Sequence, residues 1–232
     1  MTTVLEIADV CKSFTMHLRG GLVLPIVRGV NLAVRAGECV ALCGPSGAGK
    51  STILKMIFGS YRCDRGAIRL YHDDACTDIA TAEPRALIAL RRSTIAYVSQ
   101  FLRVIPRVSA IDVVAEPLIA GGIGSGTARQ RAGDLLTRLN VAERLWPLAP
   151  ATFSGGEQQR INIARGLVAD HRLVMLDEPT ASLDAENRAA VVALINQRKR
   201  SGTAIVAIVH DADVRAAIAD RTVDVSAFAA AG

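Results

Sequence analysis

The amino-acid sequence predicts an α/β fold built around a mostly parallel sheet, and two patterns support this prediction. Apolar, β-prone runs at residues 38–43, 173–177 and 204–209 are typical of buried strands. Segments with helical spacing lie between such runs, for example residues 185–200. Alternation of strands and helices along a chain indicates a parallel sheet.

Smaller elements are predicted in the first part of the chain. Residues 5–14 and 27–43 alternate apolar and polar positions, as expected for a small antiparallel sheet beside the core. The stretch between them, residues 15–25, contains two adjacent glycines and a proline and is predicted to be an irregular excursion. Residues 67–71 are predicted to form a strand and residues 84–93 a helix.

The middle of the chain, residues 101–165, has a helical pattern and is predicted to be an inserted helical subdomain. We expect one domain over residues 1–232, whose core and β subdomain occupy residues 1–100 and 166–232. The stretch 121–126, GGIGSG, fails the G-x-G-x-x-G pattern and lacks a preceding strand, so it is predicted to be a linker between helices.

A glycine-rich loop follows the first apolar run. Residues 44–51, GPSGAGKS, fit the pattern G-x-x-x-x-G-K-[ST] and lie between a predicted strand and a predicted helix, as a phosphate-binding loop requires. Glycines let backbone N–H groups surround phosphate oxygens, and the helix N-terminus adds partial positive charge. Lys50 is predicted to reach the β- and γ-phosphates of a nucleoside triphosphate, and the Ser51 hydroxyl to ligate Mg²⁺. The predicted nucleotide contacts here are Gly44, Pro45, Ser46, Gly47, Ala48, Gly49, Lys50, Ser51 and Thr52.

Two carboxylates end the second apolar run. Asp177 stands at the tip of a predicted strand, where it can hold Mg²⁺ through water beside the phosphate-binding loop. Glu178 comes next and points in another direction, so it is predicted to take a proton from the attacking water. Acidic pairs at strand ends also occur in ordinary loops, and the phosphate-binding loop upstream is what favours the catalytic interpretation.

A second anion-binding helix start is predicted within residues 153–160, FSGGEQQR. Ser154 suits the N-cap position, and Glu157 three residues later completes a capping box. Gly155 and Gly156 leave the N–H groups of the first turn unshielded, so a phosphate can approach closely. Any capped helix that begins with glycines fits this pattern. The position of residues 153–160 shortly before the acidic strand is what favours an anion-binding role.

Composition and charge restrict the classes of function. A hydrophobic fraction of 50% and a charged fraction of 21% are ordinary for a globular protein, and no apolar run approaches the length that spans a bilayer. The N-terminus lacks the organisation of a signal peptide, so we expect a cytoplasmic protein without direct membrane insertion. The net charge of +5 is scattered, so no direct binding to nucleic acid is predicted. Five cysteines without a C-x-x-C pair favour free thiols in a reducing compartment, with Cys39 and Cys43 as small buried side chains.

Over nearly its whole length, the chain resembles the nucleotide-binding subunits of the ATP-binding cassette superfamily. The segment FSGGE is similar to that family's signature motif, usually LSGGQ, with Phe153 and Glu157 as departures. The resemblance implies a RecA-like P-loop core and Mg²⁺-dependent hydrolysis of ATP. It also implies a homodimer that forms on ATP binding, with ATP clamped between the loop of one copy and the signature helix of the other.

The same resemblance implies roles for residues outside the two motifs. Gln100 resembles the loop glutamine that touches the metal or the attacking water, and His210 the histidine that contacts the γ-phosphate. Phe14 resembles the aromatic residue that stacks on adenine, although an apolar residue after a strand also suits a core. Ser182, Leu183 and Asp184 resemble the loop that couples the two sites of a dimer. The predicted catalytic residues are Lys50, Gln100, Glu178 and His210, and the predicted metal ligands are Ser51, Gln100 and Asp177.

Three segments, residues 14–30, 98–118 and 145–166, resemble the L subunits of the bacterial carbon–phosphorus lyase system. This resemblance implies an ATPase in a soluble phosphonate-degrading complex, associated with formation of α-D-ribose 1-methylphosphonate 5-triphosphate from ATP and phosphonate. The implied partners are other soluble subunits, a second cassette subunit among them, and residues 101–117 after Gln100 form the predicted docking surface.

Two alternatives to the phosphonate prediction stay open. The chain can be the nucleotide-binding subunit of a membrane transporter, of the lipid or lipoprotein exporter type, with a permease at the segment after Gln100. It can also be a DNA- or ribosome-associated ATPase module, although such relatives usually carry two cassettes or long insertions.

Overall fold

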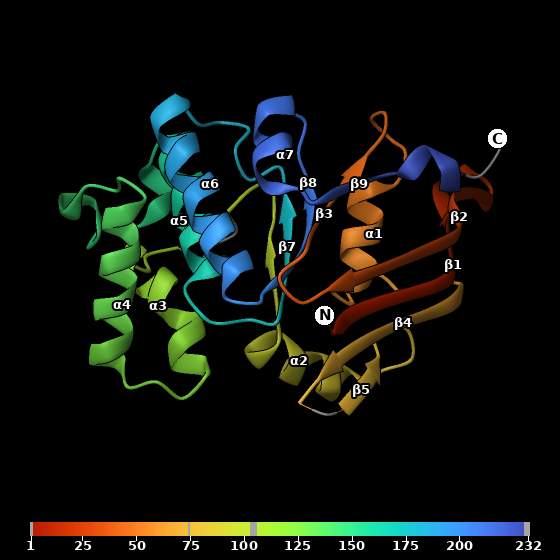
Figure 1. Ribbon diagram of the computed structural model, residues 1–232, viewed down its shortest axis with the longest axis horizontal. Helices are drawn as coiled ribbons and strands as arrows, with labels where there is room; N and C mark the ends of the chain where they lie inside the picture. The colour runs from red at the N-terminus through yellow and green to blue at the C-terminus, as the bar shows by residue number, and fades with distance from the viewer. Residues whose placement is uncertain (1, 74, 103–105, 230–232) are drawn as a thin grey trace.

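The computed structural model describes residues 2–73, 75–102 and 106–229, and it contains two sheets with helices packed around them (Figure 1). The five-stranded sheet has the order β6-β7-β8-β3-β9, and every neighbouring pair in it runs parallel. This arrangement confirms the predicted α/β fold. The strands are β3 (Cys39–Cys43), β6 (Ile95–Val98), β7 (Leu173–Asp177), β8 (Ala204–Ile208) and β9 (Arg221–Asp224).

The parallel sheet separates two hydrophobic cores. Every residue of β7 and of β8 is buried, as expected for central strands covered on both faces. Successive residues of a strand point to opposite faces. Val174 and Leu176 therefore pack in one core, with the helices of the middle of the chain. Leu173 and Met175 pack in the other core, with the antiparallel sheet.

The second sheet is antiparallel, with the order β2-β1-β4-β5. It confirms the predicted small sheet beside the core, except that residues 39–43, which were predicted to belong to it, form β3 of the parallel sheet. Its strands are β1 (Thr3–Met16), β2 (Leu22–Arg35), β4 (Arg65–His72) and β5 (Ala75–Asp78).

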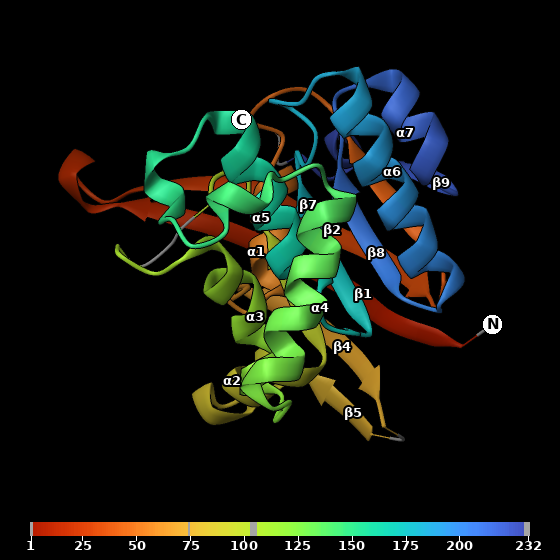
Figure 2. The same ribbon diagram turned by 90° about the vertical axis from the view of Figure 1, so that its left-hand side faces the viewer.

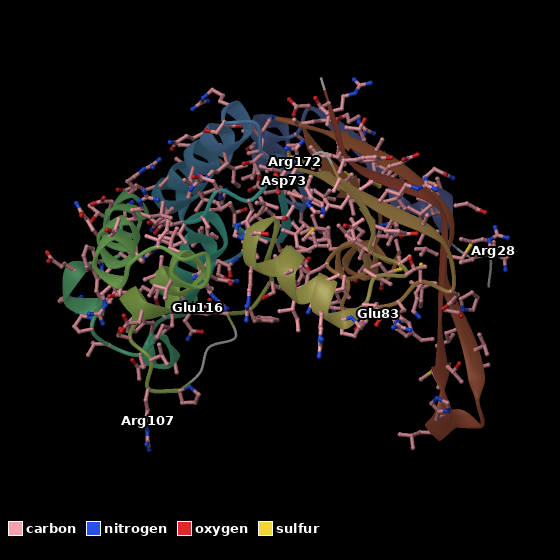
Figure 3. The ribbon with its side chains drawn as sticks, turned by 90° about the horizontal axis from the view of Figure 1, so that it is seen from below. Arg28, Asp73, Glu83, Arg107, Glu116 and Arg172 are labelled. Atoms are coloured by element: carbon pink, nitrogen blue, oxygen red, sulfur yellow. The ribbon has the colours of Figure 1, made fainter. Side chains whose placement is uncertain are left out.

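The prediction of an irregular excursion at residues 15–25 is wrong. β1 and β2 stay paired as far as Met16 and Leu22, and the resulting hairpin projects from the body of the molecule (Figure 3). Gly20 and Gly21, with φ of 66° and 78°, reverse the chain in a region of backbone conformation that glycine enters at little cost.

Pro25 does not interrupt this hairpin. It lies in β2, which is an edge strand of the antiparallel sheet. An edge strand tolerates proline because one row of its N–H groups has no ladder partner. The hairpin tip exposes Leu18, Leu22 and Val23.

Helices α3 (Ala110–Ala120), α4 (Ser125–Arg138) and α5 (Gly155–Leu167) form a helical layer at one end of the molecule (Figure 2). They agree with the predicted helical pattern, and the linker between α3 and α4 contains Gly122 with φ of 91°. The predicted docking segment 101–117 includes residues 103–105, which lie outside the described residues.

The remaining helices flank the parallel sheet: α1 (Lys50–Ile57), α2 (Pro84–Ser93), α6 (Ala185–Arg200) and α7 (Ala212–Ile218). Of these, α7 was not predicted, and neither were β5 and β9, because elements this short carry little periodic signal. Among the described residues, no helix combines the length and the apolar character that crossing a membrane needs. Cys39 is fully buried as predicted, whereas Cys43 is only half-buried because β3 ends there at the loop.

Candidate nucleotide-binding site

The phosphate-binding loop lies between β3 and α1, where the motif requires it. Gly44, Gly47 and Gly49 have φ of 128°, 82° and 95°, which side chains other than glycine rarely adopt. At Gly49 the loop also touches the antiparallel sheet, since a Cβ there would lie 2.6 Å from Cγ1 of Val27. The loop conformation therefore depends on these glycines. The other predicted contacts, Pro45, Ser46, Ala48 and Thr52, lie in the same loop or in the first turn of α1.

Lys50 folds back over the loop that precedes it. Its Nζ donates hydrogen bonds to the carbonyl oxygens of Gly44 and Pro45, both at 2.8 Å. The side chain is buried, with 8% of its surface exposed. A buried ammonium group at the mouth of a glycine loop is suited to pairing with phosphate.

Ser51 and Asp177 meet at the C-terminal edge of the parallel sheet. The Ser51 hydroxyl donates to Oδ1 of Asp177 at 3.3 Å, and Asp177 is buried, with 6% exposure. A hydroxyl and a carboxylate are the hard oxygen ligands that Mg²⁺ prefers. The two residues therefore fit the metal that the sequence predicted for this place.

Tyr97 is part of this cluster and was missed by the sequence reasoning. Its hydroxyl donates to Oδ2 of Asp177 at 2.8 Å, and its ring packs on Phe58 with centroids 5.4 Å apart. The sequence offered no direct signal for this contact, because it depends on the pairing of β6 with β7. Asp177 is thus fixed through both of its carboxylate oxygens.

Gln100 and His210 converge on Glu178. Nε2 of Gln100 donates to Oε2 of Glu178 at 3.3 Å, and Nε2 of His210 lies 3.0 Å from Oε1. Both residues lie two positions beyond their strands, because β6 ends at Val98 and β8 at Ile208. The structure thus brings three of the four predicted catalytic residues into contact.

The backbone at Glu178 is unusual. Its φ is 52°, a conformation that non-glycine residues adopt rarely and mostly at special sites. Its N–H donates to the carbonyl oxygen of Ile208 at 3.0 Å, which ties the turn after β7 to β8. In this conformation the carboxylate contacts both Gln100 and His210.

The capping box at the start of α5 is confirmed. The Ser154 hydroxyl accepts from the N–H of Glu157 at 3.3 Å, and the Glu157 carboxylate accepts from the N–H of Ser154 at 2.9 Å. Gly155 is exposed, and Gly156 packs so close to the chain at Ser182 that a Cβ would lie 3.1 Å from its carbonyl oxygen. The predicted anion-binding turn is therefore capped and open to solvent at its first glycine.

Asp184 follows the turn that Gly156 contacts and begins α6. Its carboxylate accepts from the N–H of Asn187 at 2.9 Å, and hydrogen bonds from the backbone and side chain of Asn187 hold the pKa of Asp184 below its usual range. Asp184 is thus an ionised helix cap beside the start of α5.

Gln159 was not predicted, yet it links α5 to the turn after β7. Its buried amide donates to the carbonyl oxygens of Glu178 and Pro179, at 3.4 and 3.1 Å. Asn162, three residues later, donates to the carbonyl oxygen of Ser99 at 2.5 Å. The sequence did not single out these two amides, because α5 carries other polar residues too, Gln158 and Arg160 among them.

Phe14 lies on β1 and contacts a different set of side chains. Its ring meets Tyr61 edge to face, with centroids 5.2 Å apart, and Nζ of Lys12 lies 5.1 Å from the ring centroid. Phe14 is half-buried, so part of the ring stays accessible. Its role at adenine remains a prediction.

A cleft of about 740 Å³ extends from this site toward the helical layer. Ser51, Asp177 and Gln100 contribute to its lining, together with residues of α2, α3 and α5. Arg92 of α2 and Glu116 of α3 are among them. Figure 3 shows Glu116 beside the helical layer.

Comparisons with known proteins agree with this geometry. The model of the family described as "ABC transporter" matches residues 27–181. The ABC transporter ATP-binding protein YvrO of Bacillus subtilis (strain 168), itself described as uncharacterized, is 36% identical over 220 residues, covering 95% of this chain and 92% of that protein. The macrolide export ATP-binding/permease protein MacB of Brucella abortus (strain 2308) is 36% identical over 222 residues. The chain spans only 33% of the length of that MacB relative.

Solved structures show the same architecture. A dimeric post-hydrolysis state of the ATP-binding cassette MJ0796, bound to ADP and Pi, matches with a TM-score of 0.85 and 29% identity, covering 96% of this chain and 95% of that one. The comparisons do not bear out the finer resemblance to carbon–phosphorus lyase, since the relatives that they identify are transporter proteins. By the family match, the fold and the placement of its motifs, this chain belongs to the ABC transporter family, as an ATP-binding cassette.

Proposed function

We propose that this chain hydrolyses ATP for a membrane exporter, as a homodimer that closes on ATP and passes the motion to a permease. The observation that carries the hydrolytic part is the convergence of Gln100 and His210 on Glu178. A carboxylate held between two polar side chains, beside a phosphate-binding loop, is placed to activate water. The membrane-transport part is supported by YvrO, which is described as an ABC transporter protein, and the export part by the MacB relatives, which are described as macrolide exporters.

Each residue of the site has a distinct task in this proposal. Glu178 accepts a proton from the attacking water, while Gln100 and His210 orient its carboxylate. Lys50 exchanges its two loop carbonyls for the β- and γ-phosphates of ATP. Ser51 and Asp177 would hold Mg²⁺, which supplies positive charge at the phosphates when it is bound.

The positions of the two anion-binding helix starts support the proposed homodimer. α1 and α5 stand on different sides of β7 (Figure 1), and each begins at one of the two motifs. In the proposed dimer, the phosphate held by one copy's loop meets the start of α5 from the second copy. The similar cassette of known structure is a dimer bound to ADP and Pi, which supports this arrangement.

The cleft beside Gln100 is the proposed docking site for the permease. Gln100 lines this cleft and also donates to Glu178. A partner segment that enters the cleft can therefore shift the side chain that orients the catalytic carboxylate. The cleft lies next to the segment after Gln100, which is the docking surface that the sequence predicted for either kind of complex.

Tyr97→Phe tests the metal part of the site. Removal of the hydroxyl frees Oδ2 of Asp177 from its 2.8 Å hydrogen bond, so the carboxylate is less well oriented for Mg²⁺. We expect the Mg²⁺ concentration for half-maximal ATPase activity to rise by roughly tenfold, as is usual when a partner of a metal ligand is lost. A titration of ATPase activity with Mg²⁺ at saturating ATP measures this.

Tyr71→Phe is the matched control for this titration. It removes a hydroxyl that donates to another carboxylate, Oε2 of Glu6, at 2.7 Å in the antiparallel sheet. Equal Mg²⁺ dependence of the two variants would contradict a positioning role for Tyr97.

A second candidate function is the phosphonate-degrading complex, which one observation favours. Residues 14–30, 98–118 and 145–166 resemble the carbon–phosphorus lyase L subunits, and the first of them forms the projecting part of the β1–β2 hairpin. The ATPase site would be the same in this case. Only the partner would differ, because the chain would bind a soluble enzyme subunit and not a permease.

The partner decides between the two candidates. We would purify Glu178→Gln by affinity from its native host with ATP and Mg²⁺, after separation of soluble and membrane fractions. The exporter proposal expects an integral membrane protein to copurify from the membrane fraction. Copurification of soluble phosphonate-processing subunits would overturn it in favour of the second candidate. Arg92→Glu, which reverses a charge lining the cleft, should weaken whichever partner docks there.

A further inference from the structure

Glu157 accepts hydrogen bonds from both donors of Ser154, the residue that caps the anion-binding turn. Its Oε2 accepts from the hydroxyl of Ser154 at 2.7 Å and from the backbone N–H of Ser154 at 2.9 Å. The hydroxyl and backbone bonds of Ser154 hold the pKa of Glu157 below its usual range. The carboxylate is therefore ionised at neutral pH and behaves as an anion already bound at the start of α5.

This contact uses donors that a phosphate also needs. A serine hydroxyl has a single proton to donate, and Ser154 gives it to Glu157. In the proposed dimer, the terminal phosphate of ATP from the second copy approaches this same turn. The phosphate must then replace Glu157 as the acceptor of the hydrogen bond from the Ser154 hydroxyl. It must also approach the negative charge of Glu157.

Arg160 offers the displaced carboxylate another partner. It lies one turn further along α5, and its charge helps to lower the pKa of both Glu157 and Asp184. Glu157 can therefore move from Ser154 toward Arg160 without becoming an isolated charge.

We infer that Glu157 is an internal competitor of ATP, which holds the signature turn of each copy until the phosphate of the opposite copy displaces it. Because of this competition, the dimer needs a higher ATP concentration to close than it would need without the charge of Glu157. The inference rests on the proposed ATP-dependent homodimer and adds a regulatory element to it.

Glu157→Gln in the hydrolysis-deficient Glu178→Gln background is the test. Glutamine keeps the capping box but removes the charge, and hydrogen bonds to a neutral acceptor are weaker than those to a carboxylate. We expect the ATP concentration at the midpoint of dimerisation to fall by roughly tenfold. Analytical ultracentrifugation across an ATP titration measures the midpoint. Thermal unfolding of the free chain verifies that the cap is kept.

Glu186→Gln in the same background is the matched control. Glu186 is an exposed glutamate in the first turn of the neighbouring helix α6, so the exchange removes the same charge close by without touching Ser154. Equal midpoints for the two double variants, or a higher midpoint for Glu157→Gln, would overturn the inference. If Glu178→Gln and both double variants stay monomeric at all ATP concentrations, the proposed dimer itself fails.

Discussion

Glu178→Gln is expected to lower ATP turnover by about three orders of magnitude, the loss typical for removal of a general base. The amide cannot accept a proton from water, yet it keeps the size of the carboxylate and can stay between Gln100 and His210. ATP binding should be unchanged, and the chain should accumulate as an ATP-bound dimer because the step that reopens it is blocked. Steady-state ATPase assays and size-exclusion chromatography with ATP and Mg²⁺ measure the two effects.

Glu83→Gln is the control for this experiment. Glu83 is exposed, precedes α2 and makes no capping hydrogen bond with its side chain (Figure 3). This variant should hydrolyse ATP at the rate of the unsubstituted chain. Substantial turnover by Glu178→Gln would assign the proton transfer to another group, and His210 would be the next residue to test.

Lys50→Ala should weaken ATP binding by about a hundredfold. The substitution removes the buried cation that lies against the loop carbonyls of Gly44 and Pro45, and a charge-assisted contact to a polyphosphate is among the strong hydrogen bonds of proteins. Isothermal titration with ATP and Mg²⁺ gives the affinity. Circular dichroism establishes that the variant is folded.

Arg131→Ala serves as the comparison for Lys50→Ala, because it truncates an exposed cation on α4. Its ATP affinity should equal that of the unsubstituted chain. A folded Lys50→Ala protein with undiminished affinity would remove the phosphate-binding role from residues 44–51.

The two motifs were predictable because each is written in consecutive residues. A strand, a glycine loop and a helix specify the site around Lys50 within a short stretch, and Ser154 with Glu157 specifies a capped helix start. The parallel sheet followed from the order of apolar runs. For these elements, local sequence determines local structure.

Contacts between distant segments were not predictable in the same way. Tyr97 reaches Asp177 only because β6 pairs with β7 in the register that joins Tyr97 to Met175. Gln159 reaches Glu178 and Pro179 only because α5 packs next to the turn after β7. Pattern and spacing along one chain do not contain these pairings, which depend on the three-dimensional register of neighbouring elements.

The β1–β2 hairpin shows a different limit. Its glycines and proline are ordinarily signs of irregular backbone, and here they serve a regular hairpin, with the glycines at the turn and Pro25 on an edge strand. Such residues indicate where the chain turns or lacks a ladder partner, and only the pairing around them decides whether the segment is ordered.

The hydrogen bonds of Gln159 would connect the two nucleotide sites of the proposed dimer. They attach the helix capped by Ser154 to the carbonyl oxygens of Glu178 and Pro179, and Glu178 itself bears the catalytic carboxylate. In the proposed dimer, that helix start faces the nucleotide of the opposite copy, whereas the carboxylate serves the nucleotide of its own copy. In such a dimer, nucleotide binding at one site would shift the catalytic carboxylate of the other site, and a half-filled dimer would hold two unequal sites.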